Sequence, residues 1–102
     1  MELSEYQKQA WSTALPKAKN REYITLGLVA EVGELCSKLA KHTRDGVLDF
    51  VQLKKELGDV QWFVAGFATL YGWDLNKIAE DNIKKLKDRE ARGKLTGDGD
   101  QR

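Results

Sequence analysis

The sequence has only one cysteine, one proline and one histidine among its 102 residues. The single cysteine, Cys36, excludes an internal disulfide and a multi-cysteine zinc site, and it fits a reducing compartment. We therefore expect a cytoplasmic protein, with Cys36 as a buried hydrophobic side chain beside an apolar stripe. Di-iron carboxylate bundles need Glu-x-x-His pairs, which the single His42 does not form, so we expect His42 in a capping or surface role.

Long apolar runs and an excess of one charge are also missing. No stretch approaches the ~20 apolar residues that cross a bilayer, and the first residues lack a basic region followed by an apolar one. We therefore expect neither membrane insertion nor secretion. The 17 Lys and Arg against 16 Asp and Glu give a net charge of +1. This balance lacks the basic excess of nucleic-acid-binding proteins, so no nucleic-acid polymer is expected as a partner.

Helical periodicity is present throughout the chain instead. Ser4-x-x-Gln7 has the pattern of a capping box, and it predicts a first helix over residues 4–15, ended by Pro16. Apolar residues then recur at three-and-four spacing from about Asn20 to Asp45-Gly46, which predicts a long second helix.

Two further helices follow in the same way. Asp49 is expected to cap a third helix that runs to Gly72, and Asp74 to cap a fourth that ends at Gly93. No strand pattern competes. The sequence therefore predicts an all-α fold class with four antiparallel helices, a domain over 1–92 and a flexible C-terminal tail over 93–102.

A chain of this length buries only a modest core. We therefore expect a homodimer or homotetramer in which a second copy completes the helical bundle.

Two acidic pairs, Glu31-x-x-Glu34 and Glu56-x-x-Asp59, repeat one local design on the second and third helices. The i, i+3 spacing puts both carboxylates of a pair on one helix face, and pairing of the two helices would bring all four together. Such a cluster repels itself unless it binds a cation. Carboxylate oxygens without imidazole or thiolate favour Mg²⁺, with Mn²⁺ possible, over zinc.

Solvated surface ion pairs are the alternative for these acids. Only Glu34 has a well-oriented cation, Lys38, four residues on, which weakens that alternative. Each pair also encloses a glycine, Gly33 or Gly58, and a glycine inside a helix costs roughly 1 kcal/mol relative to alanine. We therefore expect backbone or ligand to approach closely at both glycines.

These residues resemble the MazG-like family of all-alpha nucleoside triphosphate pyrophosphohydrolases, whose hallmark is Glu-Glu-x-x-Glu followed by Glu-x-x-Asp. The resemblance covers nearly the whole chain, and it implies that four acids ligate magnesium and carry catalysis, namely Glu31, Glu34, Glu56 and Asp59. It also implies cleavage of a triphosphate to a nucleoside monophosphate and pyrophosphate by water. The general base is either one of these acids or water that they hold. Ala30 stands where the family has its first glutamate.

Substrate contacts are expected from other helices. Asn82, Lys85 and Arg89 share one face of the fourth helix and are candidates for phosphate binding, which the family's Asn-x-x-Lys pattern supports; the alternative is a solvated face that complements the helix dipole. Arg102 in the tail is a candidate lid.

Base recognition is assigned to aromatic and amide side chains, with Trp62 favoured, and with Trp11 and Gln9 on the first helix as further candidates. Each is otherwise a core or surface residue. A non-catalytic nucleotide-binding or interaction module on the same fold is the alternative function, suggested by Ala30, and a structural adaptor is a third.

Overall fold

The computed structural model describes residues 1–102, which form four α-helices and one short 3₁₀ helix without any strand. The elements are α1 (Leu3–Ser12), η1 (Pro16–Ala18), α2 (Arg21–Asp45), α3 (Phe50–Leu70) and α4 (Leu75–Ala91). The predicted all-α class and the count of four helices are therefore confirmed.

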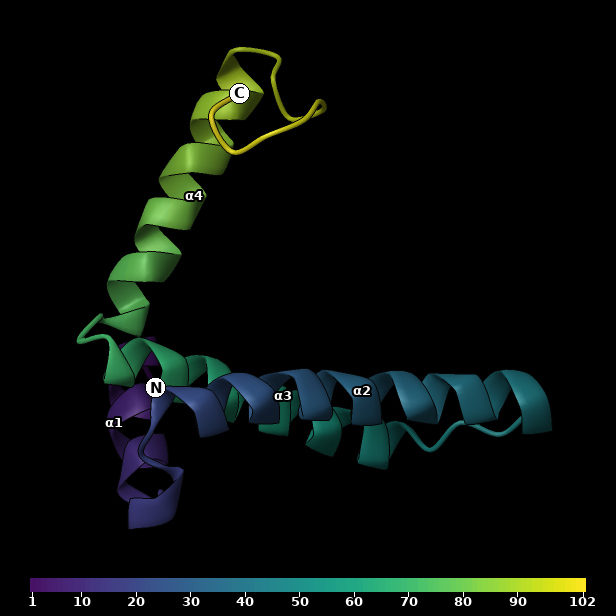
Figure 1. The fold of residues 1–102 in the computed structure, drawn as a ribbon. Helices are drawn as coiled ribbons and strands as arrows, with labels where there is room; N and C mark the ends of the chain where they lie inside the picture. The colour runs from purple at the N-terminus through teal and green to yellow at the C-terminus, as the bar shows by residue number, and fades with distance from the viewer.

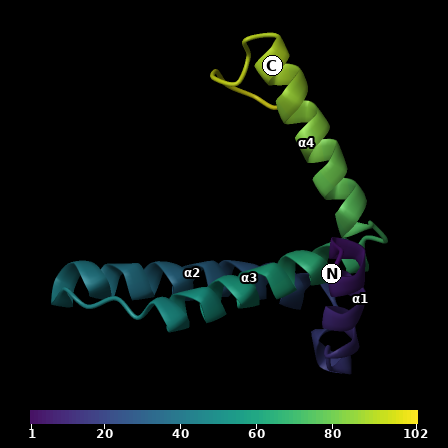
Figure 2. The same ribbon diagram turned by 180° about the vertical axis from the view of Figure 1, so that it is seen from behind.

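The longest helices, α2 and α3, lie side by side, and the chain reverses at the loop 46–49 between them (Figures 1 and 2). We call this pair the α2–α3 hairpin. Helix α1 packs across the end of the hairpin that lies far from this loop. Helix α4 leaves from the same end and points away from the hairpin. The expected antiparallel arrangement of all four helices is therefore not seen within one chain.

Side-chain caps define where three of the helices begin. Asn20, Asp49 and Asp74 each accept hydrogen bonds from backbone N–H groups in the first turn of α2, α3 and α4. These bonds satisfy donors that have no partner inside the helix. At the end of α2, Gly46 has a φ of 74°, a left-handed conformation that glycine adopts without strain. The boundaries predicted from these residues are confirmed.

The capping box predicted at Ser4 is wrong. Helix α1 begins at Leu3, and its N-cap residue Glu2 makes no side-chain capping bond. The Ser4 hydroxyl donates instead to the carboxylate of Asp74 at 2.8 Å. The Ser4 hydroxyl therefore makes a tertiary hydrogen bond to the residue that caps α4, and not the local bond of a capping box.

Gln7 links α1 to the turn between α3 and α4. Its side-chain nitrogen donates to the Thr69 hydroxyl at 3.1 Å and to the Trp73 carbonyl at 2.8 Å. Its side-chain oxygen accepts from the backbone N–H of Leu75 at 2.8 Å. One amide of α1 therefore holds both the end of α3 and the first residue of α4.

The two helices of the hairpin approach closely at Gly27, where a Cβ atom would lie 2.1 Å from the ring of Phe63. A Cβ at Gly33 or Gly58 would meet nothing within 4 Å. The close approach of backbone expected at these two glycines therefore does not occur within one chain, whereas a close approach does occur at Gly27.

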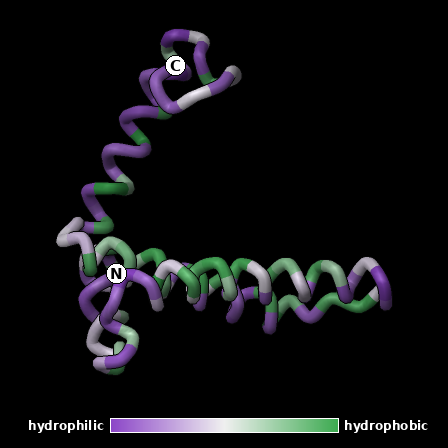
Figure 3. Tube along the Cα trace, viewed as in Figure 1, coloured by the Kyte–Doolittle hydropathy of each residue, from purple (hydrophilic) through white to green (hydrophobic).

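The core of one chain is small, with 8 of 102 residues buried. Its apolar members are Ala10, Ala18, Ile24, Ala65, Ala68 and Leu75. Apolar residues continue along the hairpin (Figure 3), and many stay exposed, including Leu57 at 57% and Ile83 of α4 at 56%. Cys36 is also exposed, so its expected burial is wrong for one chain: its part of α2 extends beyond the core.

The chain is also extended in shape. Its radius of gyration is 16.5 Å, whereas a compact domain of about 100 residues has roughly 13 Å. None of the helices combines the length and the apolar character that a membrane span requires.

Candidate metal centre

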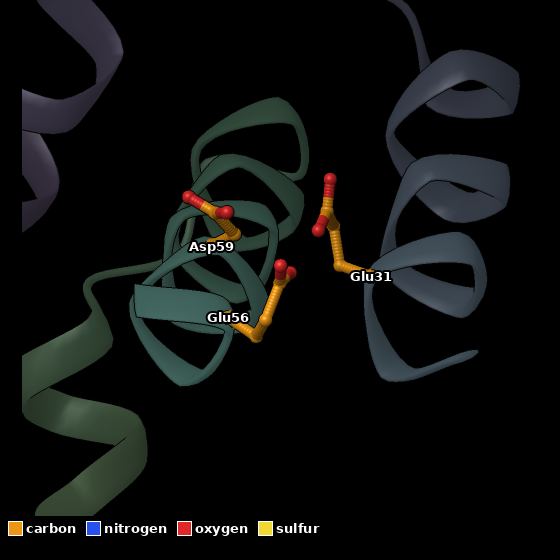
Figure 4. A group of neighbouring side chains, drawn as sticks. All are labelled: Glu31, Glu56 and Asp59. Carbon is orange, nitrogen blue, oxygen red and sulfur yellow. The ribbon is translucent and has the colours of Figure 1, made fainter. Parts of the chain in front are cut away.

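Three carboxylates meet between the two helices of the hairpin. Glu31 extends from α2 towards Glu56 and Asp59 on α3 (Figure 4). Each of the three offers one oxygen, and these oxygens all lie within 4.8 Å of one another. Glu31 and Glu56 are partly buried, whereas Asp59 is exposed. We call these residues the acidic trio.

The close contact of Gly27 with Phe63 explains why the trio forms. Glu31 follows Gly27 by one helical turn, and Asp59 precedes Phe63 by one turn. Because the two helices are antiparallel, one turn forward along α2 and one turn back along α3 cover the same distance along the hairpin axis. Glu31 and Asp59 therefore face each other, and Glu56 joins them from the next turn of α3.

The electrostatics of the trio are those of crowded like charges. Partial burial is the main cause that raises the pKa of Glu31 above its usual value, and the negative charge of Asp59 adds to it. The charges of Glu56 and Glu34 raise the pKa further. Burial and the charge of Asp59 also raise the pKa of Tyr6 in α1.

No cation of the chain compensates this charge. None of the five ion pairs in the structure includes a member of the trio or Glu34. The alternative of solvated surface ion pairs is thus not what the structure contains. A compact set of oxygen donors without histidine or cysteine suits a hard divalent cation. The residues present therefore fit Mg²⁺ or Mn²⁺.

Glu34 is not part of the acidic trio. It lies one turn along α2 from Glu31, is exposed, and acts on the trio through its charge. Spacing alone placed four carboxylates together, whereas the structure brings three within 4.8 Å. A role for Glu34 as a fourth ligand stays a prediction.

The candidates for phosphate binding lie on α4, away from the trio. Asn82 and Lys85 line a shallow hollow of about 290 Å³ together with Ile78 and Asp81. Because α4 points away from the hairpin, this hollow and the trio lie on different arms of the same chain (Figures 1 and 2).

The third candidate on α4, Arg89, is buried at 4% exposure. Its guanidinium donates to the carbonyl and to the carboxylate of Asp100 in the tail. Lys85 donates to the same carboxylate at 2.7 Å. The sequence indicated the glycine-spaced acids before Arg102 as part of a candidate lid, but not the pairing of Asp100 with these cations, because its spacing of 15 residues from Lys85 gives no periodic signal.

The candidates for base recognition lie on α1 and α3. The indole N–H of Trp62 donates to the carbonyl of Ala10 at 3.1 Å and to the hydroxyl of Thr13 at 2.9 Å. Its ring lies against that of Trp11, with 6.3 Å between centroids. Trp62 thus attaches α3 to α1. Gln9 is exposed and hydrogen bonds within α1.

Comparison with known proteins identifies the family. Residues 19–93 match the family described as the MazG nucleotide pyrophosphohydrolase domain. The chain belongs to this family. The MazG match begins before α2 and ends after α4, so it includes the acidic trio and the cations of α4, whereas α1 and most of the tail lie outside it.

One relative of this MazG chain is the "Gene 37 protein" of Mycobacterium phage L5. The two are 41% identical over 85 residues, a match that covers 78% of this chain and 75% of the phage protein. No solved structure matches.

Proposed function

We propose that this MazG protein is a magnesium-dependent pyrophosphohydrolase of nucleoside or deoxynucleoside triphosphates. The observation that carries the proposal is the acidic trio, three carboxylates from two helices that have no cation of their own. In the reaction, water attacks one phosphorus and the bridging P–O–P bond between the α and β phosphates breaks. The products are a nucleoside monophosphate and pyrophosphate.

Each acid has a role in this proposal. Glu31, Glu56 and Asp59 would hold Mg²⁺ or Mn²⁺, with Glu34 as a further ligand or as a source of negative charge beside them. The bound cation would neutralise phosphate oxygens and make the attacking water more acidic. The proton of that water passes to a carboxylate oxygen of this group or to a water that the group holds.

The substrate would contact α4 and α1. Asn82 would donate to phosphate oxygens, and Lys85 and Arg89 would neutralise them. Trp11 lines a hollow of about 390 Å³ with polar residues of α1, with Thr69 of α3 and with Asp74 before α4. It therefore offers an aromatic face for the base, with Gln9 and Trp62 as further candidates. Arg102 would act as a lid only after it leaves its bonds within the tail.

We further propose that the active form is a homodimer or homotetramer. The acids lie on the hairpin and the phosphate-binding candidates lie on α4, which points away from it (Figure 1). A second copy would supply α4 residues to the trio, and it would cover the exposed apolar faces that one chain leaves open.

The products of hydrolysis test the proposed reaction. A panel of triphosphates incubated with Mg²⁺ should yield monophosphate and pyrophosphate, and Glu56→Gln should abolish turnover. Glu22→Gln, an exposed acid at the start of α2, is the matched control and should leave turnover unchanged. Diphosphate with orthophosphate as products would reject the mechanism.

A non-catalytic nucleotide-binding or interaction module is the second candidate. Ala30, in the position before Glu31, favours it because the resemblance places a glutamate there. In this case, metal-dependent nucleotide binding measured by calorimetry should persist while the panel shows no turnover.

A further inference from the structure

The C-terminal tail, residues 93–102, folds back onto the end of α4 (Figure 2). The guanidinium of Arg102 donates to the backbone carbonyls of Lys94, Leu95 and Gly99. Arg92 at the end of α4 donates to the carbonyl of Arg102 at 2.7 Å. The last residue therefore closes the tail into a loop and fixes it to the helix.

This loop places one carboxylate on two cations of α4. Asp100 accepts from Lys85 at 2.7 Å and from Arg89 at 3.2 Å, and its own carbonyl accepts from Arg89 as well. These hydrogen bonds also lower the pKa of Asp100 below its usual value, that with Lys85 being the largest cause. The carboxylate thus stays ionised and occupies the donors that a phosphate would use.

Burial differs sharply between the partners. The Arg89 side chain is 5% exposed, so it cannot reach an anion while the tail is in place. The Asp100 side chain is 70% exposed, so water screens its attraction to the two cations, and this attraction holds it only weakly in place. An anion of higher charge can therefore displace it.

A route for such an anion is open. Asn82 lies one turn before Lys85, and both line the hollow of about 290 Å³, which Asp100 does not line. A polyphosphate can contact Asn82 first and then compete for Lys85. The last donor to become free is Arg89.

We propose that the tail is autoinhibitory: Asp100 occupies the cationic end of α4 and must leave before Lys85 and Arg89 bind a polyphosphate anion. This inference rests on the proposed role of α4 in phosphate binding. It makes Asp100 a competitor of the substrate, and it makes Arg102 the residue that holds the competitor in place.

The test is calorimetric binding of inorganic tripolyphosphate at fixed Mg²⁺ to the full chain. Asp100→Asn keeps the size of the side chain and removes its charge, so it should tighten binding about two- to fivefold. Asp98→Asn is the matched control, because Asp98 is an exposed acid of the same tail without such bonds, and it should leave binding unchanged. Weaker or unchanged binding in Asp100→Asn would overturn the proposal, as would equal tightening in both variants.

Arg102→Ala separates this role from that of a lid. Release of the tail should tighten binding as Asp100→Asn does, whereas a lid that closes over the anion would make Arg102→Ala bind more weakly. Circular dichroism of each variant checks that the helices remain formed.

The outcome is independent of turnover. Tighter tripolyphosphate binding in Asp100→Asn would support autoinhibition even if no triphosphate is hydrolysed. Hydrolysis by a protein whose anion binding does not respond to Asp100 or Arg102 would uphold the proposed function and overturn autoinhibition.

Discussion

Glu31 lies where negative charges from two helices converge, and its raised pKa shows that the folded chain disfavours its ionised form. A cation bound by the trio would remove that cost. Charge that destabilises the metal-free fold is a common property of binding sites, because the site is arranged for its ligand.

Glu31→Gln should therefore raise the melting temperature of the metal-free protein at neutral pH. The pKa of Glu31 in the folded state lies above its usual value of 4.5, so its contribution to stability is full below that pH and is lost as pH rises through the folded pKa. The difference between Glu31→Gln and the original chain should be small below pH 4.5 and should grow above it.

Thermal melts with and without Mg²⁺, at one protein concentration, measure both effects. Mg²⁺ should raise the melting temperature of the original chain but not that of Glu31→Gln. Glu34→Gln is the comparison within α2, and it should lose less of the Mg²⁺ effect because Glu34 lies outside the trio. An equal loss in both variants would instead make Glu34 a full ligand.

At the scale of the helices, local sequence signals such as capping residues were sufficient to predict much of the secondary structure. The ends of α2, α3 and α4 follow from side chains within one turn, such as Asn20 and Asp49, so they could be predicted from the sequence. Ser4 could not, because its partner Asp74 is 70 residues away. Spacing likewise placed Glu31 and Glu34 on one face but could not give the rotation of α2 against α3, which brings Glu31 and not Glu34 to Glu56 and Asp59.

The glycines of the hairpin should respond differently to alanine. Gly27→Ala should destabilise the chain by about 1–3 kcal/mol, because the new Cβ would lie 2.1 Å from Phe63. Gly33→Ala and Gly58→Ala should stabilise it by up to about 1 kcal/mol, since a Cβ there meets nothing within 4 Å and alanine favours a helix. Urea unfolding of the metal-free variants measures all three changes.

A loss of stability in Gly33→Ala or Gly58→Ala would contradict this prediction for the single chain. It would indicate that another surface, such as a second copy, approaches these two positions.

At the scale of the whole molecule, the exposed apolar residues are a consequence of the extended shape. A chain with few buried residues and a radius of gyration of 16.5 Å leaves the faces of α2, α3 and α4 without partners. The lengths and apolar stripes of these helices could be predicted from the sequence, but the direction of α4 could not, because it depends on contacts between α1 and the turn before α4.

Leu57→Gln tests the proposed assembly. In one chain Leu57 is 57% exposed, so the change should leave the monomer folded. In an assembly that covers this face, a buried amide without partners should weaken association about tenfold or more. Val47→Gln, at 74% exposure in the loop after α2, is the control and should not affect association.

Sedimentation across a range of protein concentrations measures this effect. A stable monomer with full activity would contradict the assembly itself. Association that Leu57→Gln leaves unchanged would show that the face containing Leu57 is not the interface.

The hydrogen bonds of Gln7 also bear on the order of folding. They join residues 62 to 68 positions apart, so a long loop must close before they form. Contacts within the α2–α3 hairpin join residues much nearer in sequence, and such local contacts form faster. The direction of α4 is therefore set late, once the beginning of the chain has docked onto a hairpin that already exists.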